Sequence, residues 1–261
     1  MTRAHQSLFE AFGFAVMPQL FAAEEIATIS RAFDEVMLAE RDGQPFAGQE
    51  RQVVTDWFRR HPDVGYLEKD PRILAPIKDL LGNDAALEDG NDGNYYVGDT
   101  GWHPDLGWDA AIPGGENDPY RLAGNLTRHY CPSIKVAFYL DPVDRHCGCL
   151  RVIPGSHRNP LHDKLWSLHL DIPARASKLE HVGPKLEQMW RQATGSDDGS
   201  EILLADPDFN HFHLPPAEVP CCALKSNPGD VVFFSHQLWH ASFGGRSGRR
   251  MFTLNFMSSP N

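Results

Sequence analysis

The segment Trp102-His103-Pro104-Asp105 places an imidazole and a carboxylate two positions apart. In an extended strand, residues i and i+2 point to the same face, whereas on a helix they would diverge by roughly 200°. A strand here would therefore let His103 and Asp105 bind one metal ion. Because two histidines and one carboxylate form the metal site of non-heme Fe(II) oxygenases, this hypothesis requires a second histidine elsewhere.

Two candidates for that second histidine follow a buried strand near the end of the chain. The apolar run Val231–Phe234 comes after a strong turn and leads directly to His236 and His240. These histidines are four residues apart, so they would share one face of a regular strand. Spacing alone therefore leaves both open, and the segment that follows them must decide.

The tripeptide His-Pro-Asp occurs a second time, at His61-Pro62-Asp63, within the polar and irregular region 41–66. Its neighbours show no β-alternation, and a proline after the histidine suits a turn or a helix boundary. We interpret this copy as a surface loop or helix cap. His157, which follows a tight turn, is interpreted as structural for a similar reason.

Composition indicates one folded domain spanning residues 1–261, with 41% hydrophobic and 23% charged residues. The net charge of −11, without any basic run, argues against nucleic acid as a partner. No apolar run approaches the roughly 18 residues that span a bilayer, and the N-terminus lacks an apolar signal core. We therefore expect a cytoplasmic protein with no membrane partner, as a monomer or a small homo-oligomer.

Five cysteines, an odd number, include two pairs too close in sequence for ordinary bridging, so reduced thiols are expected. A zinc site at Cys147 and Cys149 is disfavoured because structural zinc prefers C-x-x-C pairs.

Helices are predicted in the first part of the chain and strands after it. Apolar stripes at helical spacing predict helices over about 20–37 and 73–81. We thus divide the domain into an N-terminal helical part, residues 1–90, and a strand-rich core, residues 91–261. Two long segments of that core, 107–133 and 160–218, are predicted to be loops over the site.

An arginine follows the histidine pair at the distance of one chain reversal. Gly244–Gly248 can turn the chain, and Arg249–Phe256 then reads as the next strand. Arginine is suited to bidentate capture of a carboxylate, which a carboxylate-bearing reactant bound to iron would need.

Together these segments resemble the phytanoyl-CoA dioxygenase family of Fe(II)- and 2-oxoglutarate-dependent oxygenases. The resemblance covers most of the chain and rests on Phe12-Gly13-Phe14, Trp102–Asp105, Gly148–His157, Pro228–Val231 and His240–Arg250. It implies a mainly β fold with flanking helices, namely a double-stranded β-helix (jelly roll, cupin-like) with the N-terminal helices packed outside.

The resemblance also assigns roles to residues. It makes His103, Asp105 and His240 the catalytic iron ligands and gives an arginine the distal carboxylate of 2-oxoglutarate. Aligning the last strand from Phe256 favours Arg249, whereas counting from His240 also admits Arg250. Since adjacent strand residues face opposite ways, only one of them can serve. Further candidates for cofactor binding are Lys135 and Tyr139.

The implied activity is hydroxylation of an unactivated C–H bond of a small molecule by O2, with decarboxylation of 2-oxoglutarate to succinate and CO2. Desaturation, epoxidation or ring formation would use the same ligands. A non-redox cupin-type metal enzyme would need the three metal ligands but no arginine. A metal-free jelly-roll binding module would need neither the metal ligands nor the arginine. Candidate substrate contacts, all in the first predicted loop, are Trp108, Asp109, Arg121 and Arg128.

Overall fold

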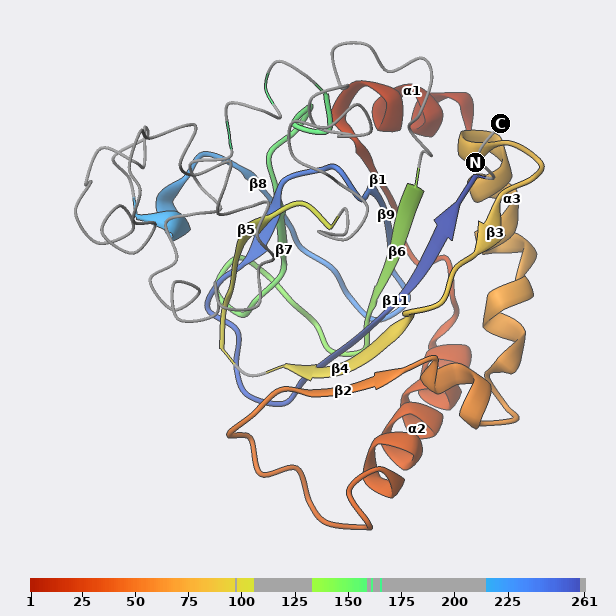
Figure 1. Ribbon diagram of the computed structural model, residues 1–261, viewed down its shortest axis with the longest axis vertical. Helices are drawn as coiled ribbons and strands as arrows, with labels where there is room; N and C mark the ends of the chain where they lie inside the picture. The colour runs from red at the N-terminus through yellow and green to blue at the C-terminus, as the bar shows by residue number, and fades with distance from the viewer. Residues whose placement is uncertain (97, 106–132, 159–160, 162–164, 166–214, 259–261) are drawn as a thin grey trace, which may run out of the picture.

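The computed structural model of the protein describes residues 1–96, 98–105, 133–158, 161, 165 and 215–258. It contains two antiparallel β-sheets, and helices cover the outer side of the larger one (Figure 1). The smaller sheet lies on the opposite side from these helices (Figure 1). The mainly β fold with flanking helices that the sequence predicted is therefore confirmed.

The larger sheet combines strands from both ends of the chain. Its order is β1 (Phe14–Met17), β9 (Val231–Ser235), β6 (Ser133–Tyr139), β11 (Arg249–Met257), β4 (Asp92–Tyr96) and β2 (Gln52–Thr55), and β3 (Ala86–Leu87) pairs with β11. At its centre β6 and β11 are antiparallel, with Tyr139 opposite Met251 and Ser133 opposite Met257.

The smaller sheet has the order β5 (Thr100–His103), β10 (His240–Ser242), β7 (Leu150–Val152) and β8 (Cys222–Leu224). In this sheet His240 lies opposite His103 on one side and opposite Val152 on the other. The two histidines expected to bind metal thus begin and end neighbouring strands.

The central strands of the larger sheet are apolar on both faces because each face is covered. In β6, Val136 and Phe138 belong to the core beneath the helices, whereas Ala137 and Tyr139 belong to the core between the sheets. The same alternation holds in β9, which explains why Val231–Phe234 is a continuous apolar run.

Three helices are described, α1 (Arg3–Phe12), α2 (Ala23–Ala39) and α3 (Pro71–Leu81), with the 3-10 turns η1 (Trp57–Arg60), η2 (Gly65–Lys69) and η6 (Pro216–Glu218). Both predicted helices are confirmed. In α2 the buried stripe includes Ile26, Ile29 and Phe33. At the start of α3 the Asp70 carboxylate accepts a hydrogen bond from the Arg72 amide at 2.8 Å.

Strand β2 and helix α1 are among the elements that the sequence did not predict. Strand β2 lies within residues 41–66, which the sequence indicated to be irregular, and it joins the larger sheet through β4. Helix α1 carries apolar residues at helical spacing, among them Leu8 and Phe12, but the structure buries none of its residues. Most of the predicted loops 107–133 and 160–218 lies outside the described residues.

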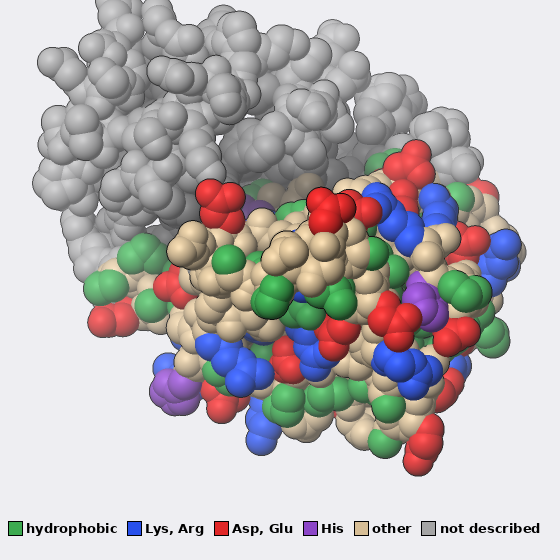
Figure 2. Space-filling view, turned by 90° about the horizontal axis from the view of Figure 1, so that it is seen from below, with side chains coloured by type: hydrophobic (Ala, Val, Ile, Leu, Met, Phe, Trp, Pro, Cys, Tyr) green, Lys and Arg blue, Asp and Glu red, His purple; other side chains and the backbone are tan. Residues whose placement is uncertain are grey.

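On the face shown in Figure 2, basic and acidic side chains are interspersed. Within the described part of the chain, no helix is long and apolar enough to cross a membrane. The four cysteines that the structure describes, Cys147, Cys149, Cys221 and Cys222, are free thiols, as expected, and Cys131 lies outside the described residues.

Candidate metal centre

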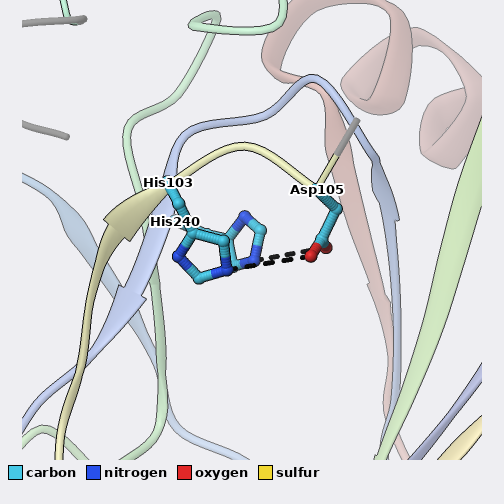
Figure 3. A group of neighbouring side chains, drawn as sticks. All are labelled: His103, Asp105 and His240. Carbon is cyan, nitrogen blue, oxygen red and sulfur yellow. Dashed lines mark ion pairs between the residues drawn. The ribbon is translucent and has the colours of Figure 1, made fainter. Parts of the chain in front are cut away.

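Three side chains converge where β5 and β10 meet. His103 and His240 project from these neighbouring strands toward Asp105, which lies in the segment after β5 (Figure 3). One ligand atom from each residue lies within 4.8 Å of the other two. The His103 Nε2–Asp105 Oδ1 distance is 3.7 Å and the His240 Nε2–Asp105 Oδ2 distance is 3.3 Å. The structure therefore brings together the three residues that the sequence singled out.

Asp105 reaches this position from outside the strand. Strand β5 ends at His103, so the argument that residues i and i+2 of one strand share a face does not account for the pair. Instead, the Asp105 amide donates a hydrogen bond to the His236 carbonyl at 2.7 Å. That contact fixes the loop, and with it the carboxylate, against the segment that precedes β10.

Both histidines have a fixed tautomer. The His103 ring approaches the Gly101 carbonyl through Nδ1 at 2.7 Å, and the His240 ring approaches the Leu238 carbonyl through Nδ1 at 2.8 Å. Because a carbonyl only accepts hydrogen bonds, Nδ1 of each neutral ring must carry the proton. The lone pair of each Nε2 is then directed at the shared site, which is the state that binds a metal.

The charges around Asp105 keep it ionised. Burial favours the neutral form, but the Lys135 ammonium, with smaller contributions from the His240 and His103 rings, outweighs burial and holds the pKa of the Asp105 carboxyl well below its usual range. Burial lowers the pKa of His240, which keeps its ring neutral. The site thus offers one anionic oxygen donor and two neutral nitrogen donors.

His236 lies beside the site without joining the group. Strand β9 ends at Ser235 and β10 begins at His240, so the two histidines do not belong to one regular strand, the case in which they would share a face. The His236 Nε2 atom lies 3.2 Å from the Asn255 side-chain oxygen. Burial, followed by the charge of Lys135, lowers the pKa of His236 to about 4.

The other histidines considered from the sequence also lie elsewhere. His61 Nε2 is 3.1 Å from Glu35 and Asp63 is 3.9 Å from Arg31, an arrangement of surface contacts near α2. His157 is buried and lies close to Gly13. Neither belongs to the group of metal-binding side chains found in the described residues.

The three converging residues line a cavity of about 280 Å³ between the two sheets. Lys135 and Tyr139 line it from β6, and Arg249 lines it from β11. Alternate residues of both strands face the cavity, as the two-residue period of a strand requires. Apolar side chains complete the walls, among them Leu150, Phe234 and Met251.

The adjacent arginines point in opposite directions. Arg249 is 1% exposed and faces the cavity, whereas Arg250 pairs with Asp34 and Asp141 at 2.8 Å and 2.9 Å. Since Asp34 belongs to α2, Arg250 connects that helix to the larger sheet. Of the two arginines that the sequence left open, Arg249 lines the cavity and Arg250 does not.

The Arg249 guanidinium is held by neutral groups. It donates hydrogen bonds to the Gly148 carbonyl and, at 2.6 Å, to the Ser242 hydroxyl, and it lies 4.7 Å from the centre of the Tyr96 ring. Within the part of the chain that the structure describes, Arg249 forms no ion pair with an acidic side chain. A buried guanidinium held in this way is suited to an anionic ligand.

Some residues around Arg249 were missed from the sequence. Gly148 adopts φ +84°, and a Cβ on it would meet the guanidinium, so only glycine leaves room there. Ser242 shares its strand with His240 two residues away, and this parity could have identified it. The predicted substrate contacts Trp108, Asp109, Arg121 and Arg128 lie outside the described residues.

A protein-family model described as phytanoyl-CoA dioxygenase (PhyH) matches residues 9–252 of this chain. The chain belongs to the phytanoyl-CoA dioxygenase family. As a member of this family it is an Fe(II)- and 2-oxoglutarate-dependent oxygenase, which confirms the enzyme class and the two cofactors expected from the sequence. A search of curated proteins found no match to the chain.

Solved structures share the fold of this phytanoyl-CoA dioxygenase family member. HygX from Streptomyces hygroscopicus, with nickel and 2-oxoglutarate bound, is 18% identical, with a TM-score of 0.60 over 99% of this chain and 88% of its own. EctD from S. alaskensis with bound Fe is 18% identical, with a TM-score of 0.61 over 99% and 77%. SnoK, a non-heme alpha ketoglutarate dependent carbocyclase from nogalamycin biosynthesis, is 17% identical, with a TM-score of 0.59 over 99% and 84%. The predicted jelly roll is thereby confirmed.

Proposed function

We propose that His103, Asp105 and His240 bind Fe(II), that Arg249 binds the distal carboxylate of 2-oxoglutarate, and that the enzyme hydroxylates an unactivated C–H bond of a small molecule. One observation carries this proposal. The three converging metal-binding side chains and the buried Arg249 guanidinium line the same cavity.

The donor set fits iron. Two imidazole nitrogens and a carboxylate oxygen, all on one side of the site, are the ligands of non-heme Fe(II) oxygenases. Asp105 Oδ2 is buried and accepts no hydrogen bond of good geometry, although Lys135 Nζ lies 2.9 Å away. An ionised oxygen in this state has capacity for a cation. When bound, Fe(II) with O2 supplies the oxidising power that cleaves the C–H bond as 2-oxoglutarate becomes succinate and CO2.

The contribution of this chain is binding and orientation. His103 and His240 present fixed lone pairs, so no ring has to rotate or lose a proton when metal binds. Arg249, held by Ser242 and Gly148, orients the co-substrate within the cavity. The apolar side chains Leu150, Phe234 and Met251 limit access of water to the bound reactants.

A direct test is anaerobic addition of Fe(II) and 2-oxoglutarate to the purified protein. A visible metal-to-ligand charge-transfer band is expected for the parent protein and should be lost in His103→Ala and Asp105→Ala, because each variant lacks an iron ligand. Replacement of His61, the histidine of the second His-Pro-Asp copy, by alanine serves as the matched control and should retain the band. Absence of the band in metal-loaded parent protein would falsify the assignment of the site.

Product mass distinguishes hydroxylation from desaturation and ring formation. A screen of small molecules should find one that stimulates succinate release, and its product should gain one oxygen atom. Loss of two hydrogen atoms would instead indicate desaturation or ring formation. Ring formation is the specific alternative because SnoK, which shares the fold, is a carbocyclase.

A further inference from the structure

A lysine from the opposite sheet reaches the candidate metal ligand Asp105. Lys135 lies on β6 of the larger sheet, whereas His103 and His240 belong to the smaller sheet. Its Nζ atom is 2.9 Å from Asp105 Oδ2, and its side chain is 20% exposed. The ion pair is thus largely removed from solvent. Charges in such a buried position interact more strongly than charges at the surface.

The lysine contacts the carboxylate oxygen that also lies near His240. Asp105 Oδ2 lies 3.3 Å from His240 Nε2, while Oδ1 is the oxygen closest to His103. An ion bound between the two imidazoles would therefore share the carboxylate with an ammonium group that is already in contact with it. Two cations beside one anion repel each other, which lowers the affinity for the ion that arrives second.

The same contact has an opposite effect before metal binds. Asp105 is mostly buried, and a buried carboxylate is costly unless a cation or hydrogen-bond donors compensate for the lost water. Lys135 provides that compensation and also restrains the rotation of the carboxylate. The carboxylate is therefore held facing the two neighbouring imidazoles (Figure 3).

We propose that Lys135 is a built-in counter-ion of Asp105, which orients this carboxylate before metal binds and limits the affinity of the site for divalent metal. Lys135 is thus a positioning residue with a measurable cost in metal binding. This inference rests on the proposed metal site. It predicts that removing the ammonium charge tightens metal binding, whereas a residue with a merely structural role would weaken it when replaced.

Calorimetric titration with Ni²⁺ tests this inference without any assay of activity. Lys135→Met removes the charge but keeps the length of the side chain, and it should bind Ni²⁺ at least about tenfold more tightly than the parent protein. Lys135→Gln should show the same increase, so a folding defect of one variant does not remove the test. Lys135→Arg retains the charge and should stay within about threefold of the parent. Unchanged or weaker binding by folded Lys135→Met or Lys135→Gln overturns the inference.

Arg51 provides a matched control because it lines the same cavity without contacting Asp105. Arg51→Met should leave Ni²⁺ affinity within about threefold of the parent, and a gain equal to that of Lys135→Met would overturn the role of the direct contact. Asp105→Ala separates the two proposals. If the parent and Asp105→Ala bind Ni²⁺ equally, the metal site itself is wrong; if only Asp105→Ala loses binding while Lys135→Met is unchanged, the inference alone fails.

Discussion

Each of the two candidate metal-binding imidazoles is oriented by a nearby backbone carbonyl. The ring of His103 bonds to the carbonyl two residues earlier, at Gly101, and the ring of His240 bonds to the carbonyl two residues earlier, at Leu238. The same local geometry therefore occurs on two neighbouring strands. A backbone carbonyl sets the tautomer of each ring, so the nitrogen donors are preorganised by the backbone conformation.

At the scale of single residues, we expect Arg249→Gln to affect 2-oxoglutarate binding and Arg250→Gln to affect the stability of the fold. Arg249→Gln should weaken 2-oxoglutarate binding by about 2–5 kcal/mol, at least roughly 30-fold, because a charged partner of the carboxylate is lost. Arg250→Gln should leave this affinity near that of the parent and lower the free energy of unfolding by about 1–3 kcal/mol, since the contacts to Asp34 and Asp141 disappear. Calorimetry and urea unfolding measure the two effects.

Parent affinity for 2-oxoglutarate in both arginine variants would place the anchor elsewhere. Equal loss in both would show that Arg250 acts through the fold, because its neighbours are α2 and the strand end at Asp141 rather than the cavity.

Residue types and their spacing were enough to predict most of the candidate site residues. A histidine and a carboxylate near each other, a distant histidine and an arginine on a following strand predicted the residues that now line one cavity. The sequence did not predict Gly148 as a support of Arg249, because their contact joins segments about a hundred residues apart, and it did not predict Ser242, although that residue shares a short strand with His240. Which arginine faces inward depended on strand register, which the turn before it left open.

At the scale of elements, the break between β9 and β10 decides how the site forms. The chain leaves the larger sheet after Ser235 and enters the smaller sheet at His240. The intervening carbonyl of His236 receives the Asp105 amide, so this turn positions two of the three ligands. The sequence predicted a buried strand over Val231–Phe234 that leads to His236 and His240, and nothing in the residues between them indicated a change of sheet.

The start of α2 offers a pH-dependent test of element stability. Glu25 accepts a hydrogen bond from the Ala22 amide at 2.9 Å and pairs with Arg72 at 2.7 Å, and Arg72 followed by Ala22 lowers the pKa of Glu25 from 4.5 to about 2. A lowered carboxyl pKa stabilises the fold fully above pH 4.5, and this contribution is lost as the pH falls through 2. Because the side chain is 36% exposed, solvent screening limits the contribution to about 1 kcal/mol.

We therefore expect Glu25→Gln to lower the free energy of unfolding by about 1 kcal/mol at pH 7, with the difference from the parent shrinking steadily below pH 4.5. Urea unfolding at several pH values measures it. Glu24→Gln is the control, because it removes a charge from the same helical turn without an ion pair to Arg72. A difference that stays constant down to pH 3 would show that the ion pair is not its source.

At the scale of the whole molecule, the order of helices and strands indicated the architecture more reliably than individual boundaries did. Helices α2 and α3 cover one face of the larger sheet, as their apolar stripes predicted (Figure 1). The pairing of β1 with β9 joins residues about as far apart as the chain allows, and no local pattern encodes that contact. Only the resemblance to a family supplied the topology.

Ligand binding should stabilise the whole molecule. Ni²⁺ at about 100 times its dissociation constant should add about 2.7 kcal/mol, which corresponds to a rise in Tm of roughly 5–10 °C for a chain of this size. Added 2-oxoglutarate should raise Tm further when Ni²⁺ is present than when it is absent, because part of its binding energy comes from the metal. Scanning fluorimetry measures both shifts.

His103→Ala provides the comparison for this thermal test. It should lose the shift produced by Ni²⁺ and retain a reduced shift with 2-oxoglutarate, because Arg249 is unaffected. A parent protein stabilised by 2-oxoglutarate to the same extent with and without Ni²⁺ would argue against a shared site.

Arg249 belongs to the larger sheet, while His103 and His240 belong to the smaller one. A co-substrate held by both the metal and Arg249 would act as a removable crosslink between the two layers of the sandwich. Its binding would slow hydrogen exchange of the backbone amides in both β10 and β11. Departure of succinate would remove this link, so local opening of the two sheets would become more frequent once in each catalytic cycle.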